Sequence, residues 1–118
     1  MTPQQSRIKS FQVAGSGFRH AVSTQKNFQI QVAIGLLVIV AAYYFNFSRV
    51  EWLILLITIG LVLTAELVNT VIEVVVDLAV KEELLPEAKI AKDVSAAAVL
   101  VISVFSVVIG LILFLPHL

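Results

Sequence analysis

An otherwise apolar run of the chain carries four polar residues at helical spacing. The segment ELVNTVIEVVVD holds three carboxylates and an amide, spaced three, four and four residues apart: Glu66, Asn69, Glu73 and Asp77. Because residues three and four apart share one face of an α-helix, these side chains are predicted to form a single polar stripe. Carboxylate and amide oxygens suit a hard cation such as Mg²⁺, which in proteins often bridges to substrate phosphates. The stripe therefore indicates phosphate chemistry with a divalent cation.

A second polar group, Lys92 and Asp93, follows the stripe in the run AKIAKDVSAAAVL. A lysine near a membrane surface can bind phosphate as a point charge. Asp93 could cap the following helix or bind a ribose hydroxyl. The small residues 95–98 would allow another helix to approach closely. If the helices on either side of the short connection pack antiparallel, Lys92 and Asp93 converge on the stripe.

The elements that must position these residues are strongly apolar. Of the 118 residues, 59% are hydrophobic and 14% are charged, whereas a soluble domain has about 45–50% and about 25%. A soluble fold of this size could not bury so much apolar surface. Runs long enough to cross a bilayer, about 20 residues each, occur at residues 28–47, 50–80 and 94–115. All are predicted to be helices, since other backbones cannot be satisfied in hydrocarbon.

The first 27 residues contain basic and apolar residues at helical spacing and no acid. This pattern predicts an amphipathic helix on the membrane surface, in which Gly15 and Gly17 are expected to mark a bend or a close-packing site. Four of the eight Lys and Arg residues precede the first span, and three lie in the connection at residues 81–93. By the positive-inside rule, both regions are expected in the cytoplasm. No apolar block precedes residue 28, so no cleaved signal peptide is predicted.

Composition also excludes several classes of function. The chain has no cysteine, which excludes disulfides, thiolate metal sites and cysteine nucleophiles. The formal net charge is zero, so electrostatics do not select a nucleic-acid partner. The charges of Lys81, Glu82 and Glu83 indicate a solvated loop, or charges beside a bound nucleotide.

The run AELVNTVIEVVVDL followed by AKIAKDVSAAAVL resembles the small integral-membrane lipid kinases, prokaryotic diacylglycerol kinase and undecaprenol kinase. The resemblance extends over nearly the whole chain, including TQKNF before the first span and GLILFLP at the end of the last. The sequence of these motifs is more similar to the undecaprenol kinase branch of Gram-positive bacteria.

The resemblance implies an all-α membrane protein, with an N-terminal surface helix and three spans, that forms a homotrimer in the bacterial inner membrane. It implies phosphorylation of a lipid alcohol, undecaprenol or diacylglycerol, with ATP and Mg²⁺. Glu66 would be the general base, Lys92 would contact the transferring phosphate, and Glu73 and Gln25 would hold the metal. The residues implied near ATP are Arg7, Asn69, Asp77, Glu82, Glu83, Lys92 and Asp93.

The chain also departs from the family pattern. Gln25 stands where the family has a metal-binding glutamate, and Gln31 stands where histidine or glutamate is common. One alternative is therefore that the chain is a catalytically weak family member that only binds nucleotide or lipid. A small oligomeric subunit that conducts cations or protons is a second alternative, because acids inside membranes also mark ion pathways. The first and third spans contain no acid, which disfavours conduction.

Overall fold

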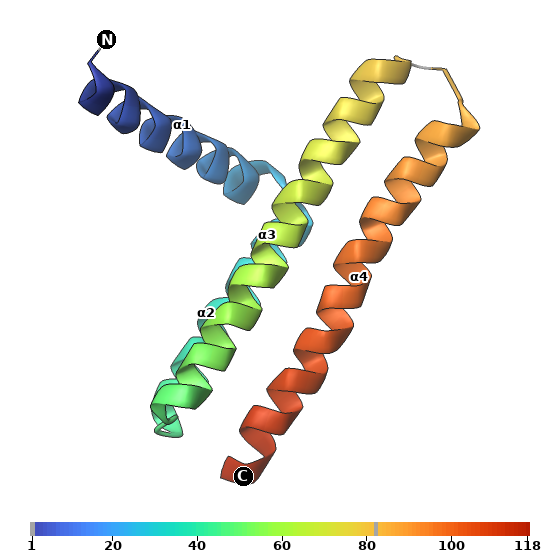
Figure 1. Ribbon diagram of the computed structural model, residues 1–118. Coiled ribbons are helices and arrows are strands. Elements are labelled where there is room, and N and C mark those ends of the chain that lie inside the picture. Colours follow the sequence, from blue (N-terminus) through green and yellow to red (C-terminus); the bar gives the residue numbers. More distant parts are fainter. Residues whose placement is uncertain (1, 82) are drawn as a thin grey trace.

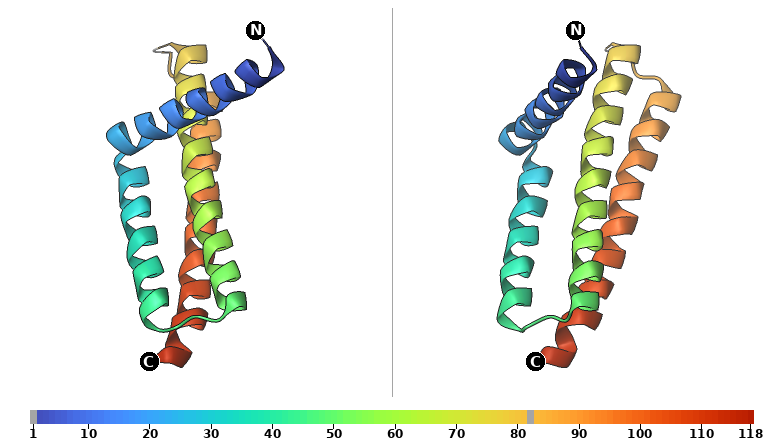
Figure 2. Two further views of the ribbon diagram at one scale, coloured as in Figure 1. Left: turned by 90° about the vertical axis from the view of Figure 1, so that its left-hand side faces the viewer. Right: turned by 60° about the vertical axis from the view of Figure 1, so that its left-hand side comes forward.

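The computed structural model describes residues 2–81 and 83–118, and this part of the chain is helical with short connections (Figure 1). The elements are α1 (Pro3–Thr24), α2 (Lys26–Tyr44), α3 (Arg49–Val80), α4 (Pro86–Phe114) and a final 3₁₀ turn, η1 (Leu115–His117). The three long helices α2, α3 and α4 run side by side in alternating directions, whereas α1 leaves them at a steep angle (Figures 1 and 2). The prediction of an all-helical chain is confirmed for these residues.

Local sequence sets where several helices begin. Thr2 caps α1, and Ser48 caps α3 in a reciprocal arrangement with Glu51. The backbone N–H of Glu51 donates to Ser48 Oγ at 3.2 Å, and the backbone N–H of Ser48 donates to Glu51 Oε1 at 2.9 Å. Such a capping box satisfies two backbone donors that a helix start leaves without partners. Pro3 and Pro86 occupy first helical positions, where the missing N–H of proline costs nothing.

The connection between α3 and α4 is shorter than residues 81–93. Pro86 begins α4, because its fixed φ suits the first turn of a helix. Lys92 and Asp93 therefore lie inside α4 rather than at its start. Leu85 occupies the N-cap position, so the expectation that Asp93 could cap this helix is wrong.

The expected bend or close-packing site in α1 is also absent from the structure. The helix continues through Gly15 and Gly17, and a Cβ at either position would have no neighbour within 4 Å. Glycine in a helix interior costs about 1 kcal/mol relative to alanine without breaking the helix. Gly35 of α2 differs, since a Cβ there would lie 3.3 Å from Ile59 Cγ2. That glycine lets α2 approach α3 closely.

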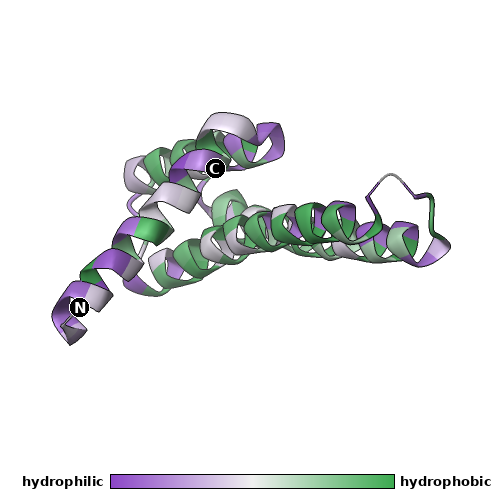
Figure 3. Cartoon of the chain, turned by 90° about the horizontal axis from the view of Figure 1, so that it is seen from above, coloured by the Kyte–Doolittle hydropathy of each residue, from purple (hydrophilic) through white to green (hydrophobic). Residues whose placement is uncertain are grey.

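Within residues 2–81 and 83–118, three helices are long and apolar enough to cross a membrane: α2, α3 and α4 with its final turn. Figure 3 shows them as largely hydrophobic, with more hydrophilic residues along α1. The 32 residues of α3 extend roughly 48 Å at about 1.5 Å per residue, whereas the hydrocarbon core is about 30 Å thick. Of the residues in an apolar 18-residue stretch of α4, only 6% are buried within the chain. Such a surface requires lipid or another protein to cover it.

A cluster of buried apolar residues lies where α2 turns into α3. Its buried residues, Ala42, Phe47, Leu55 and Leu113, are surrounded by further apolar side chains from α2, α3 and α4. The ring centroids of Phe47 and Phe114 are 4.8 Å apart. This cluster fixes the three long helices against one another at this end of the bundle.

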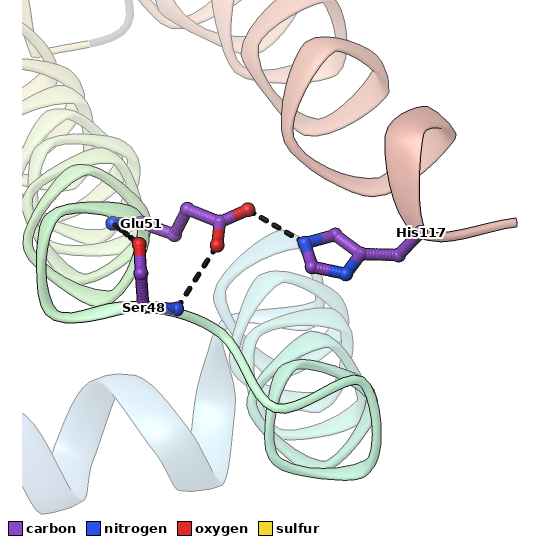
Figure 4. Close-up of polar contacts among 3 residues, drawn as sticks. All are labelled: Ser48, Glu51 and His117. Atoms are coloured by element: carbon purple, nitrogen blue, oxygen red, sulfur yellow. Dashed lines mark hydrogen bonds and ion pairs between the residues drawn. The ribbon is translucent and has the colours of Figure 1, made fainter.

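A polar cluster ties the last turn of the chain to the start of α3 (Figure 4). His117 Nε2 lies 2.7 Å from Glu51 Oε2, and since a carboxylate only accepts, the imidazole N–H donates. The imidazole also stacks on Phe47, with ring centroids 5.0 Å apart. Glu51 thus serves both the cap of α3 and the attachment of η1.

Replacing His117 tests this attachment. His117→Ala should lower the melting temperature by a few degrees, because both the hydrogen bond and the ring stacking are lost. His117→Phe keeps a ring and should lose less. Thermal unfolding in detergent micelles, followed by circular dichroism, measures both. An alanine variant that melts with the wild type would show that the contact contributes nothing.

Candidate active site

The polar stripe lies on the half of α3 that approaches the α3–α4 connection, and its burial changes along the helix. Glu66 is buried, with 5% of its surface exposed, Asn69 and Glu73 are half-buried, and Asp77 is exposed. The structure therefore carries carboxylates from the interior of the helix bundle out to its polar end.

Glu66 lines a cavity of about 290 Å³ between α2, α3 and α4. Gln31 lines the same cavity from α2, and Ser103 lines it from α4. The remaining walls are mostly apolar. A buried carboxylate that a hydroxyl group can still reach through a cavity has the placement that a general base requires.

A hydrogen-bonded chain connects α4 to the middle of the stripe. The Ser95 hydroxyl donates to Asn69 Oδ1 at 2.8 Å, and Asn69 Nδ2 donates to Glu73 Oε1 at 3.3 Å. Ser95 is buried, with 7% of its surface exposed. Both ends of the Asn69 amide are therefore hydrogen-bonded, the oxygen to Ser95 of α4 and the nitrogen to Glu73 of α3.

Two ion pairs lie at the outer end of the stripe. Lys92 Nζ is 2.7 Å from Asp77 Oδ1 and joins α4 to α3, whereas Lys89 Nζ is 2.6 Å from Asp93 Oδ2 within α4. All four side chains are substantially exposed to solvent. Exposed ion pairs contribute little to stability, so an arriving phosphate can displace either carboxylate from its lysine.

These pairs lie in a second, larger cavity of about 1310 Å³ at the α3–α4 connection. This volume exceeds the roughly 300–1,000 Å³ of ordinary ligand pockets. Its charged lining residues come from both helices and the connection between them: Asp77, Lys81, Glu83, Lys89, Lys92 and Asp93. The cavity has room for a nucleotide and supplies lysines that could bind its phosphates.

Other residues implied by the family resemblance are not brought to these cavities. Arg7 is exposed on α1, and Gln25 is half-buried where α1 meets α2. Neither lines the cavity of Glu66 or the larger one, and the side chain of Gln25 bonds to none of the described residues. Glu82 lies outside the described residues.

The stripe fits Mg²⁺ by the chemistry of its donors. Glu73 accepts one hydrogen bond, on Oε1, and its second carboxylate oxygen receives none from the residues that the structure describes. Carboxylate oxygens suit a hard cation such as Mg²⁺ rather than a soft one. Across residues 2–81 and 83–118, no three His, Cys, Asp or Glu side chains gather closely enough to hold a metal. Glu73 therefore needs ligands from outside this set.

Comparison with known proteins identifies the family. The family model for prokaryotic diacylglycerol kinase matches residues 12–114. The chain belongs to this family of lipid kinases.

Two curated relatives resemble this prokaryotic diacylglycerol kinase family member along most of its length. An undecaprenol kinase of Bacillus subtilis is 42% identical over 111 residues, covering 94% of this chain and 89% of the relative. A diacylglycerol kinase of Synechocystis sp. is 41% identical over 111 residues, again 94% of this chain but 63% of the relative. The resemblance seen in the sequence motifs is thereby confirmed.

Sequence reasoning missed the contact that Ser95 makes in this family member. From the sequence alone, Ser95 is only one of several small residues that allow close packing. The available signal was its position three residues after Lys92, which puts both on one face of α4. A hydroxyl on the face directed at the stripe has polar partners within reach.

The buried position of Glu66 makes a prediction about stability. A carboxylate inside a membrane helix costs at least about 2.5–3.5 kcal/mol, and an amide of the same shape costs less. Glu66→Gln should therefore raise the melting temperature by a few degrees, whereas Glu87→Gln on the exposed start of α4 should not. Thermal unfolding of both variants in detergent micelles measures this. A Glu66→Gln variant less stable than the wild type would show that the carboxylate supports folding.

Proposed function

We propose that the protein transfers the γ-phosphoryl group of ATP to the hydroxyl group of a membrane lipid alcohol, with undecaprenol as the preferred acceptor and diacylglycerol as the alternative. The observation that carries the proposal is the buried Glu66 carboxylate, which lines a cavity between apolar helices on the same helix face as the charged residues beyond it. A lipid hydroxyl can approach from the bilayer while ATP approaches from water. Undecaprenol is favoured because the chain covers 89% of the Bacillus undecaprenol kinase.

The proposed location is the bacterial inner membrane, with the N-terminus and the charged cavity in the cytoplasm. The distribution of Lys and Arg supports this orientation, and ATP is available on that side. We assign residues 1–27 to a surface helix, 28–47, 50–80 and 94–115 to the three spans, and 81–93 to the cytoplasmic segment. Apolar side chains of α1, such as Phe11 with 80% of its surface exposed, support a helix that rests on lipid.

The proposed assembly is a homotrimer in which each active site uses more than one protomer. Within one chain, Gln25 and Arg7 line neither cavity of the candidate site, and many large apolar side chains of α4 are exposed. A second copy beside α4 would cover this surface. It would also bring an α1–α2 junction, with its Gln25, toward the stripe of its neighbour.

The proposed reaction follows from the side chains of the stripe. Glu66 accepts the proton of the lipid hydroxyl as its oxygen bonds to the γ-phosphorus, and the bond from that phosphorus to the bridging oxygen of ADP breaks. Lys92 exchanges Asp77 for the phosphoryl oxygens and stabilises their charge. When bound to Glu73 and Gln25, Mg²⁺ would neutralise charge on the nucleotide phosphates. ATP is oriented in the larger cavity by carboxylates that line it, those of Asp77, Glu83 and Asp93.

The direct test is phosphoryl transfer by the purified protein in lipid bilayers. With labelled ATP and Mg²⁺, labelled lipid should appear with undecaprenol, and more slowly with diacylglycerol. Transfer to neither alcohol by folded protein would remove the kinase proposal. Under that result, nucleotide binding would identify a weak relative, and cation flux through the same bilayers would identify a conducting subunit.

The metal ligands can be tested by a matched set of substitutions. Glu73→Gln should lower transfer at least a hundredfold. Residues that only hold a metal ligand in place already contribute about 10–100-fold to metal affinity, and Glu73 is proposed to bind the metal directly. Gln25→Glu should raise transfer at low Mg²⁺, since it adds a charged ligand, and Glu87→Gln should change nothing. Initial rates over a range of Mg²⁺ concentrations measure all three, with chromatography to check the oligomer. A fully active Glu73→Gln variant would exclude this role.

A further inference from the structure

Asn69 has a single chemically consistent orientation between its two neighbours. An ionised carboxylate can only accept hydrogen bonds, so the end of the Asn69 amide that faces Glu73 must be its NH₂ group. The carbonyl oxygen then faces α4, where the Ser95 hydroxyl is 2.8 Å from it and must donate. Each group in the chain from Ser95 to Glu73 therefore has one defined role.

Ser95 is well placed to hold this orientation. Its side chain is buried, and it reaches across from α4 to α3, where Asn69 lies 26 positions earlier in the chain. The Ser106 hydroxyl, further along α4, instead donates to the backbone carbonyl of Ser103 within its own helix. Ser95 is thus a hydroxyl of α4 that bonds to the polar stripe, whereas Ser106 is a hydroxyl of α4 with a purely local partner.

We infer that Ser95 is a positioning residue of the active site, which fixes the Asn69 amide so that Asn69 holds the Glu73 carboxylate as a hydrogen-bond donor and does not itself bind the cation. The inference deepens the proposed function and rests on it for the identity of the cation. The Asn69 carbonyl oxygen, which a cation would need, is bonded to Ser95. The Asn69 NH₂ group restrains Oε1 of Glu73, which leaves the other carboxylate oxygen for the metal.

Substitution at Asn69 distinguishes a donor from a ligand. Asn69→Asp has nearly the same shape and replaces the NH₂ group with a charged oxygen. If Asn69 is a donor, the new carboxylate repels Glu73 and divalent-cation binding should weaken. If Asn69 is a ligand, the added negative charge should make binding as tight as in the wild type or tighter.

The experiment uses the full chain in lipid bilayers, with Mn²⁺ and a non-hydrolysable ATP analogue, and measures bound Mn²⁺ by electron paramagnetic resonance. Ser95→Ala should weaken Mn²⁺ binding about tenfold, and Asn69→Asp should weaken binding at least as much. Ser106→Ala is the matched control and should bind as the wild type does. Mn²⁺ binding by Asn69→Asp as tight as in the wild type would overturn the inference.

A second measurement needs neither metal nor turnover. The asparagines of the chain are Asn27, Asn46 and Asn69, so the ¹⁵N side-chain amide signals of asparagine-labelled protein are few, and the pair lost in Asn69→Asp belongs to Asn69. Ser95→Ala should shift this pair, and Ser106→Ala should not. An unshifted pair in Ser95→Ala would overturn the inference. If the pair shifts while the wild type transfers phosphate to no lipid alcohol, the contact stands and the kinase proposal fails.

Discussion

The rest of this structure depends on one constraint, which is the cost of keeping carboxylates inside a helix that must cross hydrocarbon. Glu66 is buried among apolar helices, where an uncompensated charge is costly. The stripe meets this constraint by facing other helices and cavities rather than lipid. Helix α3 is longer than a bilayer requires, so its outer carboxylates can extend into water while its apolar part remains in the membrane.

The two ends of the bundle are held together by different interactions. Where α2 turns into α3, buried aromatic and aliphatic side chains interlock, and His117 ties the chain end to Glu51. At the α3–α4 connection, the helices are joined by an exposed ion pair between Lys92 and Asp77. Regions with few buried apolar contacts open at low cost in free energy. The packed end can therefore keep the helices aligned while the polar end opens, as the proposed nucleotide site requires.

Much of the fold follows from the sequence. Few structures other than helices can span the hydrocarbon of a bilayer, and helical periodicity places the stripe on one face. Contacts between helices were harder to predict. The bond from Ser95 to Asn69 depends on how α3 and α4 are rotated about their axes, which periodicity within each helix does not specify. Proline ends one helix and begins another equally well, so Pro86 alone does not tell where α4 begins. Gly15 and Gly17 suggested a bend, but glycine permits irregular backbone without requiring it.

The carboxylates of α3 are proposed to gather a divalent cation together with a nucleoside triphosphate. Paramagnetic broadening by Mn²⁺ tests this proposal most directly, in protein with ¹³C-labelled glutamate carboxyl groups, bound to a non-hydrolysable ATP analogue in bilayers. The account predicts that the Glu73 signal broadens beyond detection while that of Glu51, at the opposite end of α3, remains sharp. A sharp Glu73 signal with the Mn²⁺–nucleotide complex bound, or equal broadening of both signals, would contradict it.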